Sequence, residues 1–300
     1  MTSTQALVAG VELGGTKVIC TLATAPDDVR AEVSIRTTTP AETLGLVHDQ
    51  LADWARNEPI TAVGYASFGP IELNPASPDY GRIVNTTKPG WSGADVLATG
   101  RGLGLPLGFD TDVNGAALAE GRWGAARGLS TFAYITVGTG VGVGSIVNGR
   151  AVRGLGHSEA GHLRVPRVPG ATFPGICSFH GDCVEGLVSG PAIEAAAGRP
   201  AEALAADDPV WDEVVHGLAM LVHNLALTLA PERVLIGGGV GMGQAHLLPR
   251  VRRSVVESLN AYGGSPAIAS GIEQWIQHPE LKDRAGPLGA VALAIDALGA

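Results

Sequence analysis

The chain is built from short apolar runs that alternate with longer stretches of mixed polarity. Apolar runs that end at glycine or proline turns predict buried strands at 6–13 (ALVAGVEL), 62–70 (AVGYASFGP) and 233–241 (RVLIGGGVG). The run KVICTLAT at 17–24 follows a Gly-Gly turn and is predicted to pair with the first strand as a hairpin.

Two further segments combine strand and turn signals. Residues 105–128 (LPLGFDTDVNGAALAEGRWGAARG) predict a strand, a turn at DTDVN and an alanine-rich helix. Residues 131–152 (TFAYITVGTGVGVGSIVNGRAV) predict a strand, a glycine turn, a second strand and an Asn-Gly hairpin. Residues 79–93 (DYGRIVNTTKPGWSG) are typical of a loop.

Helical spacing occurs in three other segments. Apolar residues recur at helical intervals within 41–57, namely Leu44, Leu46, Val47, Leu51 and Trp54. Residues 188–228 are predicted to be mostly helical, and the apolar tail at 285–299 is helix-like, whereas 154–186 is predicted to be irregular. Because strands alternate with helices, the pattern predicts an α/β fold.

Composition narrows the class of protein. The chain has 300 residues, of which 45% are hydrophobic and 16% charged, enough for a substantial core. A net charge of −9 without a Lys/Arg run argues against nucleic-acid binding. We expect no signal peptide and no membrane span, since the apolar run GLAMLVHNLALTLA is short and is interrupted by His223 and Asn224. A cytoplasmic location is therefore expected, where thiols stay reduced and a Cys177–Cys183 disulfide is disfavoured.

Three predicted strands run into glycine turns, in GVELGGT, AYITVGTGVG and VLIGGGVG. Backbone N–H groups in such turns are open to an anionic ligand, and three turns together indicate a nucleotide held between two lobes. None of the turns matches G-x-x-x-x-G-K-[ST], and none matches G-x-G-x-x-G between a strand and a helix. The pattern therefore disfavours a P-loop and a dinucleotide-binding fold.

The stretch GICSFHGDCVEG at 175–186 indicates a metal site. Cys177, His180 and Cys183 follow one another at intervals of three residues, and thiolate and imidazole are the ligands that zinc prefers in tetrahedral sites. Gly181 would help the chain to bend around the ion. The best fourth ligand upstream is His162, and His157 competes with it.

Together these segments resemble the ROK family of sugar kinases, specifically its bacterial zinc-containing fructokinase branch. The resemblance covers nearly the whole chain: GVELGGTK and AYITVGTGVGVG match two phosphate motifs, VLIGGGV the adenosine motif, DTDVNGAALAEGRWGAARG the catalytic segment, SFGPIELNPASPDYG a fructokinase segment, and SEAGH with CSFHGDCVEGLVSGPAI the zinc signature. The zinc signature and TDVNGAALAE are highly specific, whereas the glycine motifs alone are not.

The resemblance implies a two-lobed actin-like ATPase fold, related to ribonuclease H, with the active site in the cleft between the lobes. We expect an N-terminal lobe of residues 1–115 plus about 285–300, and a C-terminal lobe of residues 116–284 that carries the zinc loop at 157–186. The lobes would close over ATP and sugar and exclude water from the phosphoryl transfer.

The resemblance also implies the roles of individual residues. Asp112 is the implied general base. The residues alone leave two alternatives open: Asp112 could cap the helix, or Asp110, two residues earlier, could be the base. The implied sugar-binding residues are Gly69, Asp112, Glu159, His162 and Glu185. The implied nucleotide-binding residues are Glu12, Gly14, Gly15, Thr16, Lys17, Gly138, Thr139, Gly140, Gly237, Gly238 and Gly239. The implied zinc ligands are His162, Cys177, His180 and Cys183.

The expected activity is ATP-dependent phosphorylation of fructose to fructose 6-phosphate, with ATP and Mg²⁺ as cofactors and a structural Zn²⁺. Glu12, where many relatives have Asp, is expected to contact water around the magnesium ion. A homodimer is expected. The alternatives are a kinase for glucose, mannose or an N-acylmannosamine, and a non-catalytic sugar sensor. A repressor is disfavoured, because the first phosphate motif begins by residue 10 and leaves no room for a helix-turn-helix domain.

Overall fold

The computed structural model describes residues 6–299, which form two compact units. Unit 1 comprises the described residues up to Trp123, with Arg153–His157 and the residues from Asp283 onward. Unit 2 comprises Gly124–Val152 and Ser158–Lys282. The expected boundary at residue 115 falls inside helix α3 (Asp112–Trp123), whereas the division follows the end of that helix. The reason is that α3 packs against α11 (Ala285–Ala297) within unit 1.

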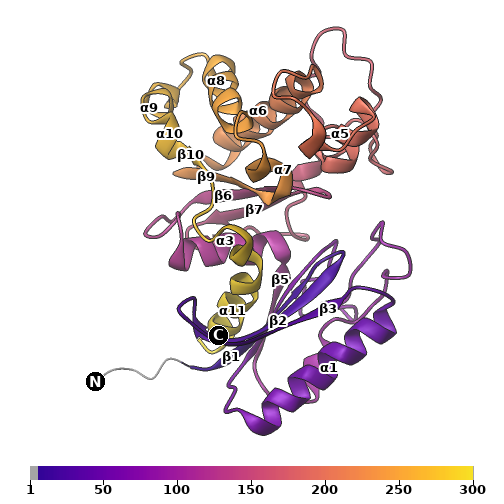
Figure 1. The fold of residues 1–300 in the computed structure, drawn as a ribbon. Coiled ribbons are helices and arrows are strands. Elements are labelled where there is room, and N and C mark those ends of the chain that lie inside the picture. The colour runs from indigo at the N-terminus through magenta and orange to yellow at the C-terminus, as the bar shows by residue number, and fades with distance from the viewer. Residues whose placement is uncertain (1–5, 300) are drawn as a thin grey trace. The chain divides into compact units, whose positions relative to one another are not determined.

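Unit 1 is built on a five-stranded sheet of order β3-β2-β1-β4-β5 (Figure 1). Its strands are β1 (Val8–Leu13), β2 (Lys17–Ala25), β3 (Asp28–Arg36), β4 (Val63–Ser67) and β5 (Leu107–Thr111). The first three strands form an antiparallel meander, and β4 and β5 run parallel to β1. The strands predicted at 6–13 and 17–24, their hairpin and the strand predicted within 105–128 are confirmed.

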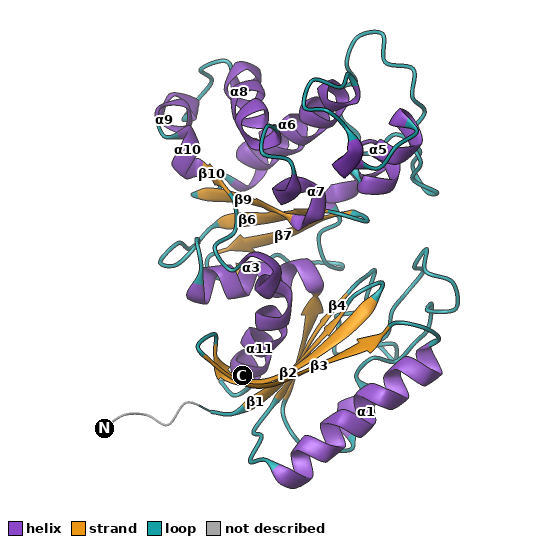
Figure 2. Ribbon diagram, in the orientation of Figure 1, coloured by secondary structure: helices purple, strands orange, loops and turns teal. Residues whose placement is uncertain are grey.

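Helices cover both faces of this sheet (Figure 2). Helix α1 (Pro40–Asn57) lies on one face, and Thr39 caps it by accepting the Glu42 N–H at 3.4 Å. Its core face consists of Val47, Leu51 and Trp54, all buried, which confirms the predicted helix. Leu46 is 48% exposed, because it lies off the stripe that these three residues define.

A row of three glycines brings α11 onto the other face of the sheet. Gly10, Gly64 and Gly108 are direct neighbours across β1, β4 and β5. A Cβ atom on Gly64 would lie 2.0 Å from the Ala290 carbonyl oxygen, and one on Gly108 would lie 2.1 Å from that of Leu293. The helix backbone therefore rests directly on the sheet, which only glycine permits.

Unit 2 repeats the strand arrangement in a second five-stranded sheet of order β10-β9-β6-β7-β8. Its strands are β6 (Phe132–Val137), β7 (Val141–Val147), β8 (Arg150–Ala151), β9 (Arg233–Gly237) and β10 (Ile276–Gln277). In each unit the first strand pairs antiparallel with the second across a glycine turn, and parallel with a later strand. The two predicted glycine-turn hairpins are thereby confirmed.

Most of the remaining helical segments belong to unit 2. They are α2 (Ala98–Arg101), η1 (Ala160–His162), α4 (Val184–Val188), α5 (Gly190–Ala197), η2 (Ala201–Ala203), α6 (Val210–Leu229), α7 (Gly238–Gly243), α8 (Leu247–Leu259), α9 (Ser265–Ser270), α10 (Ile272–Trp275) and η3 (Lys282–Arg284). Helices α6 and α8 pack together over the sheet of unit 2, and Trp211, Leu218 and Val251 are fully buried there.

Several sequence expectations need correction. The predicted turn at DTDVN is absent, since α3 begins at Asp112 directly after β5. The strand predicted over 233–241 ends at Gly237, and the glycines that follow open α7. Strand β3 and helix α8 are not among the predicted elements. In β3, apolar residues alternate strictly with polar ones, a strand signal that was overlooked, and the apolar stripe of α8 lies among arginines.

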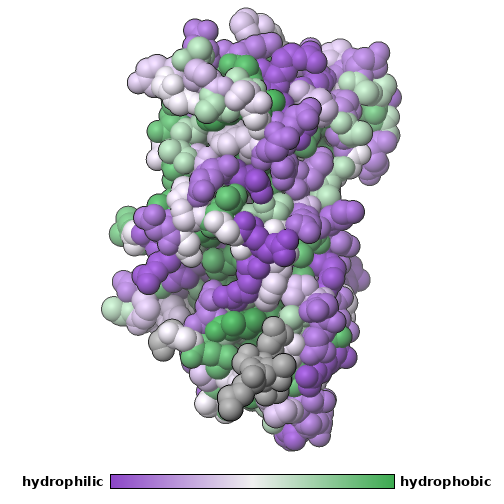
Figure 3. Space-filling model, turned by 90° about the vertical axis from the view of Figure 1, so that its left-hand side faces the viewer, coloured by the Kyte–Doolittle hydropathy of each residue, from purple (hydrophilic) through white to green (hydrophobic). Residues whose placement is uncertain are grey.

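No helix among residues 6–299 is long and apolar enough to cross a membrane. The surface in Figure 3 mixes hydrophilic and hydrophobic side chains across the face in view. This mixture is ordinary for a folded protein, because apolar atoms make up much of any protein surface.

Candidate functional site

The first glycine turn, Gly14–Thr16, joins β1 to β2 in unit 1. Gly14 donates its N–H to the Lys17 carbonyl at 3.0 Å. Thr37 fastens the turn from the end of β3, since its Oγ1 donates to the Gly14 carbonyl at 2.8 Å and its N–H to the Thr16 carbonyl at 2.9 Å. A Cβ atom on Gly15 would meet no atom within 4 Å, so the turn is open on that side.

Glu12 lies on β1, just before this turn. Its carboxylate is so close to the first turn of α11 that a Cβ atom on Gly286 would lie 2.0 Å from Oε1. Burial, and next the nearby charge of Asp112, raise the pKa of Glu12 from 4.5 to about 7. The Glu12 and Asp112 side chains therefore interact electrostatically within unit 1.

The two candidate base carboxylates have different surroundings. Asp110 is completely buried, and its carboxylate accepts hydrogen bonds from Arg153 Nη2 at 2.6 Å, Asn114 Nδ2 at 2.8 Å and the Thr111 N–H at 2.8 Å. Asp112 is only partly buried, at the first residue of α3, and its Oδ1 accepts the Val113 N–H at 2.9 Å. The surroundings of Asp110 are those of a structural carboxylate, and those of Asp112 leave it accessible.

Thr111 takes the capping position that the sequence offered to Asp112. Its Oγ1 accepts the N–H of Asn114 at 3.2 Å, which is the hydrogen bond of an N-cap residue at the start of α3. Asp112 is thus the first helical residue, where its negative charge is favourable beside the helix N-terminus.

Gly69 lies two residues beyond the end of β4. The bond from Gly69 to Pro70 is a cis peptide, and the Pro70 carbonyl accepts the Val84 N–H at 2.7 Å. This candidate sugar contact therefore lies on the same unit as Asp112, at the carboxyl end of a strand that neighbours β5.

The second glycine turn, Gly138–Gly140, joins β6 to β7 in unit 2. Gly138 donates its N–H to the Gly140 carbonyl at 2.9 Å, and its own carbonyl accepts the Gly190 N–H at 2.7 Å. Glu185 lies against this turn, because its Oε2 accepts the N–H of Val141 at 3.1 Å. Thr139 lies between these glycines and is exposed. The structure thus brings the second glycine turn and one predicted sugar-binding carboxylate together.

The third glycine turn, Gly237–Gly239, lies at the carboxyl end of β9. Because β9 is parallel to β6, this turn and the second one meet at the same edge of the sheet. A Cβ atom on Gly238, whose φ is +82°, would lie 2.4 Å from the Val137 carbonyl oxygen, so glycine is required there. Gly239 has open space beside its Cα.

Glu159, His162 and Glu185 form a polar group in unit 2. His162 Nε2 lies 3.9 Å from Glu185 Oε1. Burial raises the pKa of Glu159, a shift that His162 opposes and that the charge of Glu185 reinforces. Two carboxylates and an imidazole in one group can accept several hydroxyl hydrogen bonds, which is the chemistry of a sugar site.

The four expected metal ligands come together in unit 2. The ligand atoms of His162, Cys177, His180 and Cys183 all lie within 4.8 Å of one another. A tight loop makes this possible: Cys177 and Gly181 exchange backbone hydrogen bonds at 3.1 and 2.8 Å, and Gly181 has a φ of +66°. The glycine expected to bend the chain does so.

The distances within this cluster fit zinc. A sulfur at about 2.3 Å and a nitrogen at about 2.05 Å from one tetrahedral zinc ion lie about 3.6 Å apart. His162 Nδ1 lies 3.6 Å from Cys177 Sγ and 3.5 Å from Cys183 Sγ, and His180 Nδ1 lies 3.6 Å from Cys177 Sγ. The donor set of two thiols and two imidazoles is also the one that structural zinc sites use.

His157 is not part of the cluster. It belongs to unit 1, where its Nε2 accepts the Ile71 N–H at 3.0 Å. The choice of fourth ligand that spacing left open thus falls on His162. All three cysteines are free thiols, and Cys20 lies apart from the cluster in the core of unit 1.

Comparison with known proteins decides the family. The model of the ROK family matches residues 8–297. This chain belongs to the ROK family. The fructokinase of Pediococcus pentosaceus is 37% identical over 293 residues, which cover 97% of this chain and 99% of that protein. The fructokinase of Zymomonas mobilis subsp. mobilis is 39% identical over 295 residues, or 96% of each chain.

Solved structures of the ROK family share the fold. The ROK hexokinase from Thermus thermophilus matches with a TM-score of 0.77 at 23% identity, over 98% of this chain and 99% of that one. The resemblance to the ROK family and the actin-like α/β fold that it implied are confirmed.

Three residues beside the candidate site were missed by sequence reasoning. Thr111 was overlooked as the cap of α3, although a Thr directly before a helical run is a recognisable N-cap signal. Arg153, the partner of Asp110, is 43 residues away along the chain and carries no local signal. Lys88 was read only as part of a loop, yet its ammonium donates to the Gly15 carbonyl in the first glycine turn.

Proposed function

We propose that this chain is an ATP-dependent fructokinase that converts fructose to fructose 6-phosphate. The observation that carries the proposal is the similarity to fructokinases, at 34–39% identity, over nearly the whole chain. The glycine turns and the group of Glu159, His162 and Glu185 support it, since they suit an anionic nucleotide and a polyhydroxyl substrate.

In the proposed step, the 6-hydroxyl oxygen of fructose forms a bond to the terminal phosphorus of ATP as the bond from that phosphorus to the bridging oxygen of ADP breaks. Asp112 accepts the proton of the attacking hydroxyl. Its partial exposure at the start of α3 suits this role, whereas Asp110 is already saturated by Arg153, Asn114 and a backbone N–H. General-base catalysis of this kind contributes about 10²–10⁴-fold.

Sugar binding is assigned to Gly69 and Asp112 in unit 1 and to Glu159, His162 and Glu185 in unit 2. A carboxylate accepts hydrogen bonds from two hydroxyls at once, so Glu159 and Glu185 suit vicinal sugar hydroxyls. His162 Nε2 faces Glu185 while Nδ1 faces the thiols, which supports a role of one imidazole in both the sugar site and the metal site.

Nucleotide binding is assigned to the three glycine turns. The turn residues are Gly14, Gly15, Thr16, Gly138, Thr139, Gly140, Gly237, Gly238 and Gly239. Lys17, the first residue of β2, adds a positive charge beside the first turn. Glu12 would hold the water shell of the magnesium ion, and ATP with Mg²⁺ supplies the phosphoryl group when bound.

Zinc is assigned to His162, Cys177, His180 and Cys183. Four protein ligands would close the coordination sphere, so the role of zinc here is structural. Holding Nδ1 of His162 would fix the imidazole plane and the direction of Nε2 toward the sugar site. A homodimer is also part of the proposal, and light scattering coupled to gel filtration tests it.

The deciding experiment is a coupled ATP-consumption assay with magnesium, run on fructose, glucose, mannose and N-acetylmannosamine before and after chelator treatment. Strong preference for fructose, with activity lost on zinc removal and restored by zinc, supports the proposal. Preference for another hexose would keep the ROK mechanism and overturn the substrate. Hexose binding without turnover would identify a sugar sensor instead.

A further inference from the structure

The loop of residues 84–92, here called the lysine loop, carries Lys88 at its middle. It is closed at its base by backbone pairing: Gly93 donates to the Ile83 carbonyl at 2.7 Å, and Ile83 to the Ala94 carbonyl at 2.9 Å. Inside the loop, the Thr86 N–H donates to Ser92 Oγ at 3.2 Å. The loop is thus tied across at its base and again nearer its tip.

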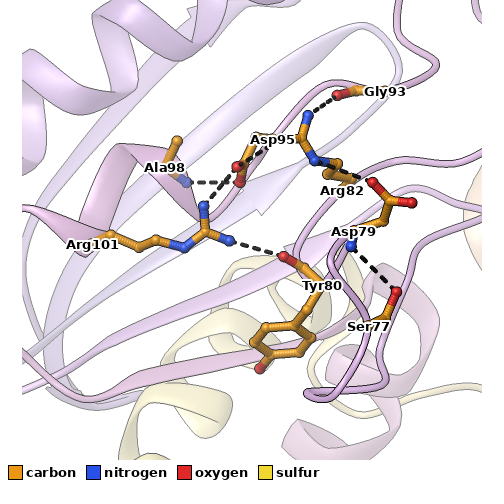
Figure 4. A network of polar contacts seen from close by, with 8 residues as sticks. All are labelled: Ser77, Asp79, Tyr80, Arg82, Gly93, Asp95, Ala98 and Arg101. Carbon is orange, nitrogen blue, oxygen red and sulfur yellow. Dashed lines mark hydrogen bonds and ion pairs between the residues drawn. The ribbon is translucent and has the colours of Figure 1, made fainter.

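A network of charges braces the base of the lysine loop (Figure 4). Arg82 donates to the Gly93 carbonyl at 2.9 Å and forms ion pairs with Asp79 at 3.6 Å and Asp95 at 3.7 Å. Arg101 reaches the same Asp95 at 2.6 Å and also donates to the Tyr80 carbonyl at 2.8 Å. Because Asp95 is shared by two guanidinium groups, the two limbs of the loop are fixed to each other and to α2.

Trp91 anchors the loop in the core of unit 1. Its side chain is fully buried, and its Nε1 donates to the Thr38 carbonyl at 3.0 Å. The ring of Phe68, which follows β4, packs edge-on against it with 5.3 Å between ring centroids. The Trp91 N–H donates to the Lys88 carbonyl at 3.2 Å, so the position of the lysine backbone follows from that of the buried indole.

From this braced loop, the Lys88 ammonium reaches the first glycine turn. Its Nζ donates to the Gly15 carbonyl at 2.5 Å, across 73 residues of sequence. Thr37 engages the Gly14 and Thr16 carbonyls, so all three carbonyls of the turn are held by unit 1 itself. Among residues 6–299, no carbonyl accepts the N–H groups of Gly15 or Thr16, which leaves them available to an anion.

The charge context makes this lysine unusual. The chain has three lysines, Lys17, Lys88 and Lys282, and a net charge of −9. A triphosphate that approaches the first turn also approaches the carboxylates of Glu12 and Asp112. A cation at the turn offsets that repulsion, and an ammonium on a flexible four-carbon stem can follow a phosphoryl group as it moves.

We propose that Lys88 is a catalytic residue whose ammonium passes from the Gly15 carbonyl to the terminal phosphoryl oxygens of ATP. This inference rests on the proposed function. Lys88 would stabilise negative charge on the transferred group and remain protonated throughout, while the hydroxyl proton goes to Asp112. The lysine loop supplies the preorganisation, because its brace and its buried tryptophan hold the stem of Lys88 beside the turn.

The test compares Lys88→Met with Lys88→Arg, and with Lys282→Met as a control of the same charge change at an exposed position. Titration calorimetry with magnesium measures the affinity of each variant for ADP and for AMPPNP, a non-hydrolysable ATP analogue that keeps the third phosphoryl group. Because a charge-assisted hydrogen bond is lost, Lys88→Met should weaken AMPPNP binding about tenfold or more and ADP binding less than about twofold.

Steady-state kinetics give the second readout. Lys88→Met should lower kcat about 10²-fold, the usual effect of removing one electrostatic donor, with a much smaller change in the KM for fructose. Lys88→Arg should recover part of the AMPPNP affinity, because it keeps the charge, and Lys282→Met should match the wild type in both readouts.

Two results would overturn the inference. Equal losses for ADP and AMPPNP, or a lower melting temperature with kcat retained, would mean that Lys88 only braces the loop. A wild-type protein that binds neither nucleotide would instead refute the proposed function itself, and Lys88 with it.

Discussion

The two aspartates around the start of α3 allow a sharp test of the proposed mechanism. Asp112→Asn and Asp110→Asn are the same chemical change two residues apart, and both remove one negative charge. From the structure, we expect opposite effects of the two substitutions on turnover and stability. Asp112→Asn should abolish most turnover and leave the fold intact, whereas Asp110→Asn should destabilise unit 1.

The magnitudes follow from the contacts. Asn at position 112 keeps an oxygen for the Val113 N–H, and Thr111 still caps the helix. Removing the charge relieves its repulsion of Glu12 and loses its favourable interaction with the helix N-terminus. That loss costs about 0.3–1 kcal/mol. Asn at position 110 weakens the bond from Arg153 Nη2, which is 2.6 Å long and meets a carboxylate that is 1% exposed. Breaking a fully buried pair costs about 3–5 kcal/mol, and since Arg153 is 46% exposed we expect about 2–3 kcal/mol.

Thermal unfolding followed by circular dichroism, together with the coupled kinase assay, measures both effects. At about 2–4 °C per kcal/mol, Asp110→Asn should lower Tm by about 4–12 °C, and Asp112→Asn by less than about 4 °C. In the kinase assay, Asp112→Asn should lower kcat about 10²–10⁴-fold. Asp110→Asn should retain most of its kcat at a temperature where it is still folded.

A reversal of the two variants would refute this reasoning. If Asp110→Asn were folded and inactive while Asp112→Asn was active, Asp110 would be the base. If Asp112→Asn unfolded as readily as Asp110→Asn, its role would be structural after all.

Three further results are expected. Cys177→Ala should lose bound zinc, because a structural site needs its fourth ligand, whereas Cys20→Ala should retain the metal. Mass spectrometry of metals after dialysis measures the zinc content, and equal zinc in both variants would exclude the proposed ligand set. Since the pKa of Glu12 is raised to about 7, its ionisation opposes folding as pH rises from 4.5 to about 7. Without nucleotide, Glu12→Gln should therefore be more stable than the wild type by about 1–3 kcal/mol above pH 7 and by almost nothing below pH 4.5. A gain in stability that does not depend on pH would argue against the raised pKa. Gly64→Ala should destabilise unit 1 by about 3 kcal/mol or more in denaturant unfolding, because the added Cβ would meet the backbone of α11 at 2.0 Å. Gly45→Ala in α1, with open space beside it, should instead raise the stability by about 0.5–1 kcal/mol. Similar effects of the two changes would contradict the close packing of α11.

Much of the fold could be predicted from local sequence patterns. The apolar runs before glycine turns predicted β1, β6 and β9, because a buried strand and a tight turn each have a strong local signature. Helix α1 was predicted for the same reason, from its apolar stripe. Strand β3 was missed although Val29, Ala31, Val33 and Ile35 alternate with polar residues, which is the local pattern of a strand with one covered face. In the fold it is held mainly by pairing with β2.

The candidate zinc site shows where local signals stop. Spacing alone indicated Cys177, His180 and Cys183, since ligands within one loop reveal themselves by their intervals. Spacing did not distinguish His162 from His157, which are five residues apart. The folded chain separates them, because β7 and η1 bring His162 to the cysteines while His157 contacts Ile71 in the other unit.

The sequence by itself determined which residue types this protein has for its chemistry: the glycine turns, the paired aspartates, the Cys/His cluster and the family to which they belong. Only the tertiary structure decided which of these residues contact one another. It set Asp110 against Arg153 and left Asp112 accessible, gave the capping role to Thr111, and brought Lys88 to the Gly15 carbonyl 73 residues away. The physical reason is that turns, caps and metal loops are specified by neighbours in sequence, whereas ion pairs and charge placement depend on which distant segments pack together.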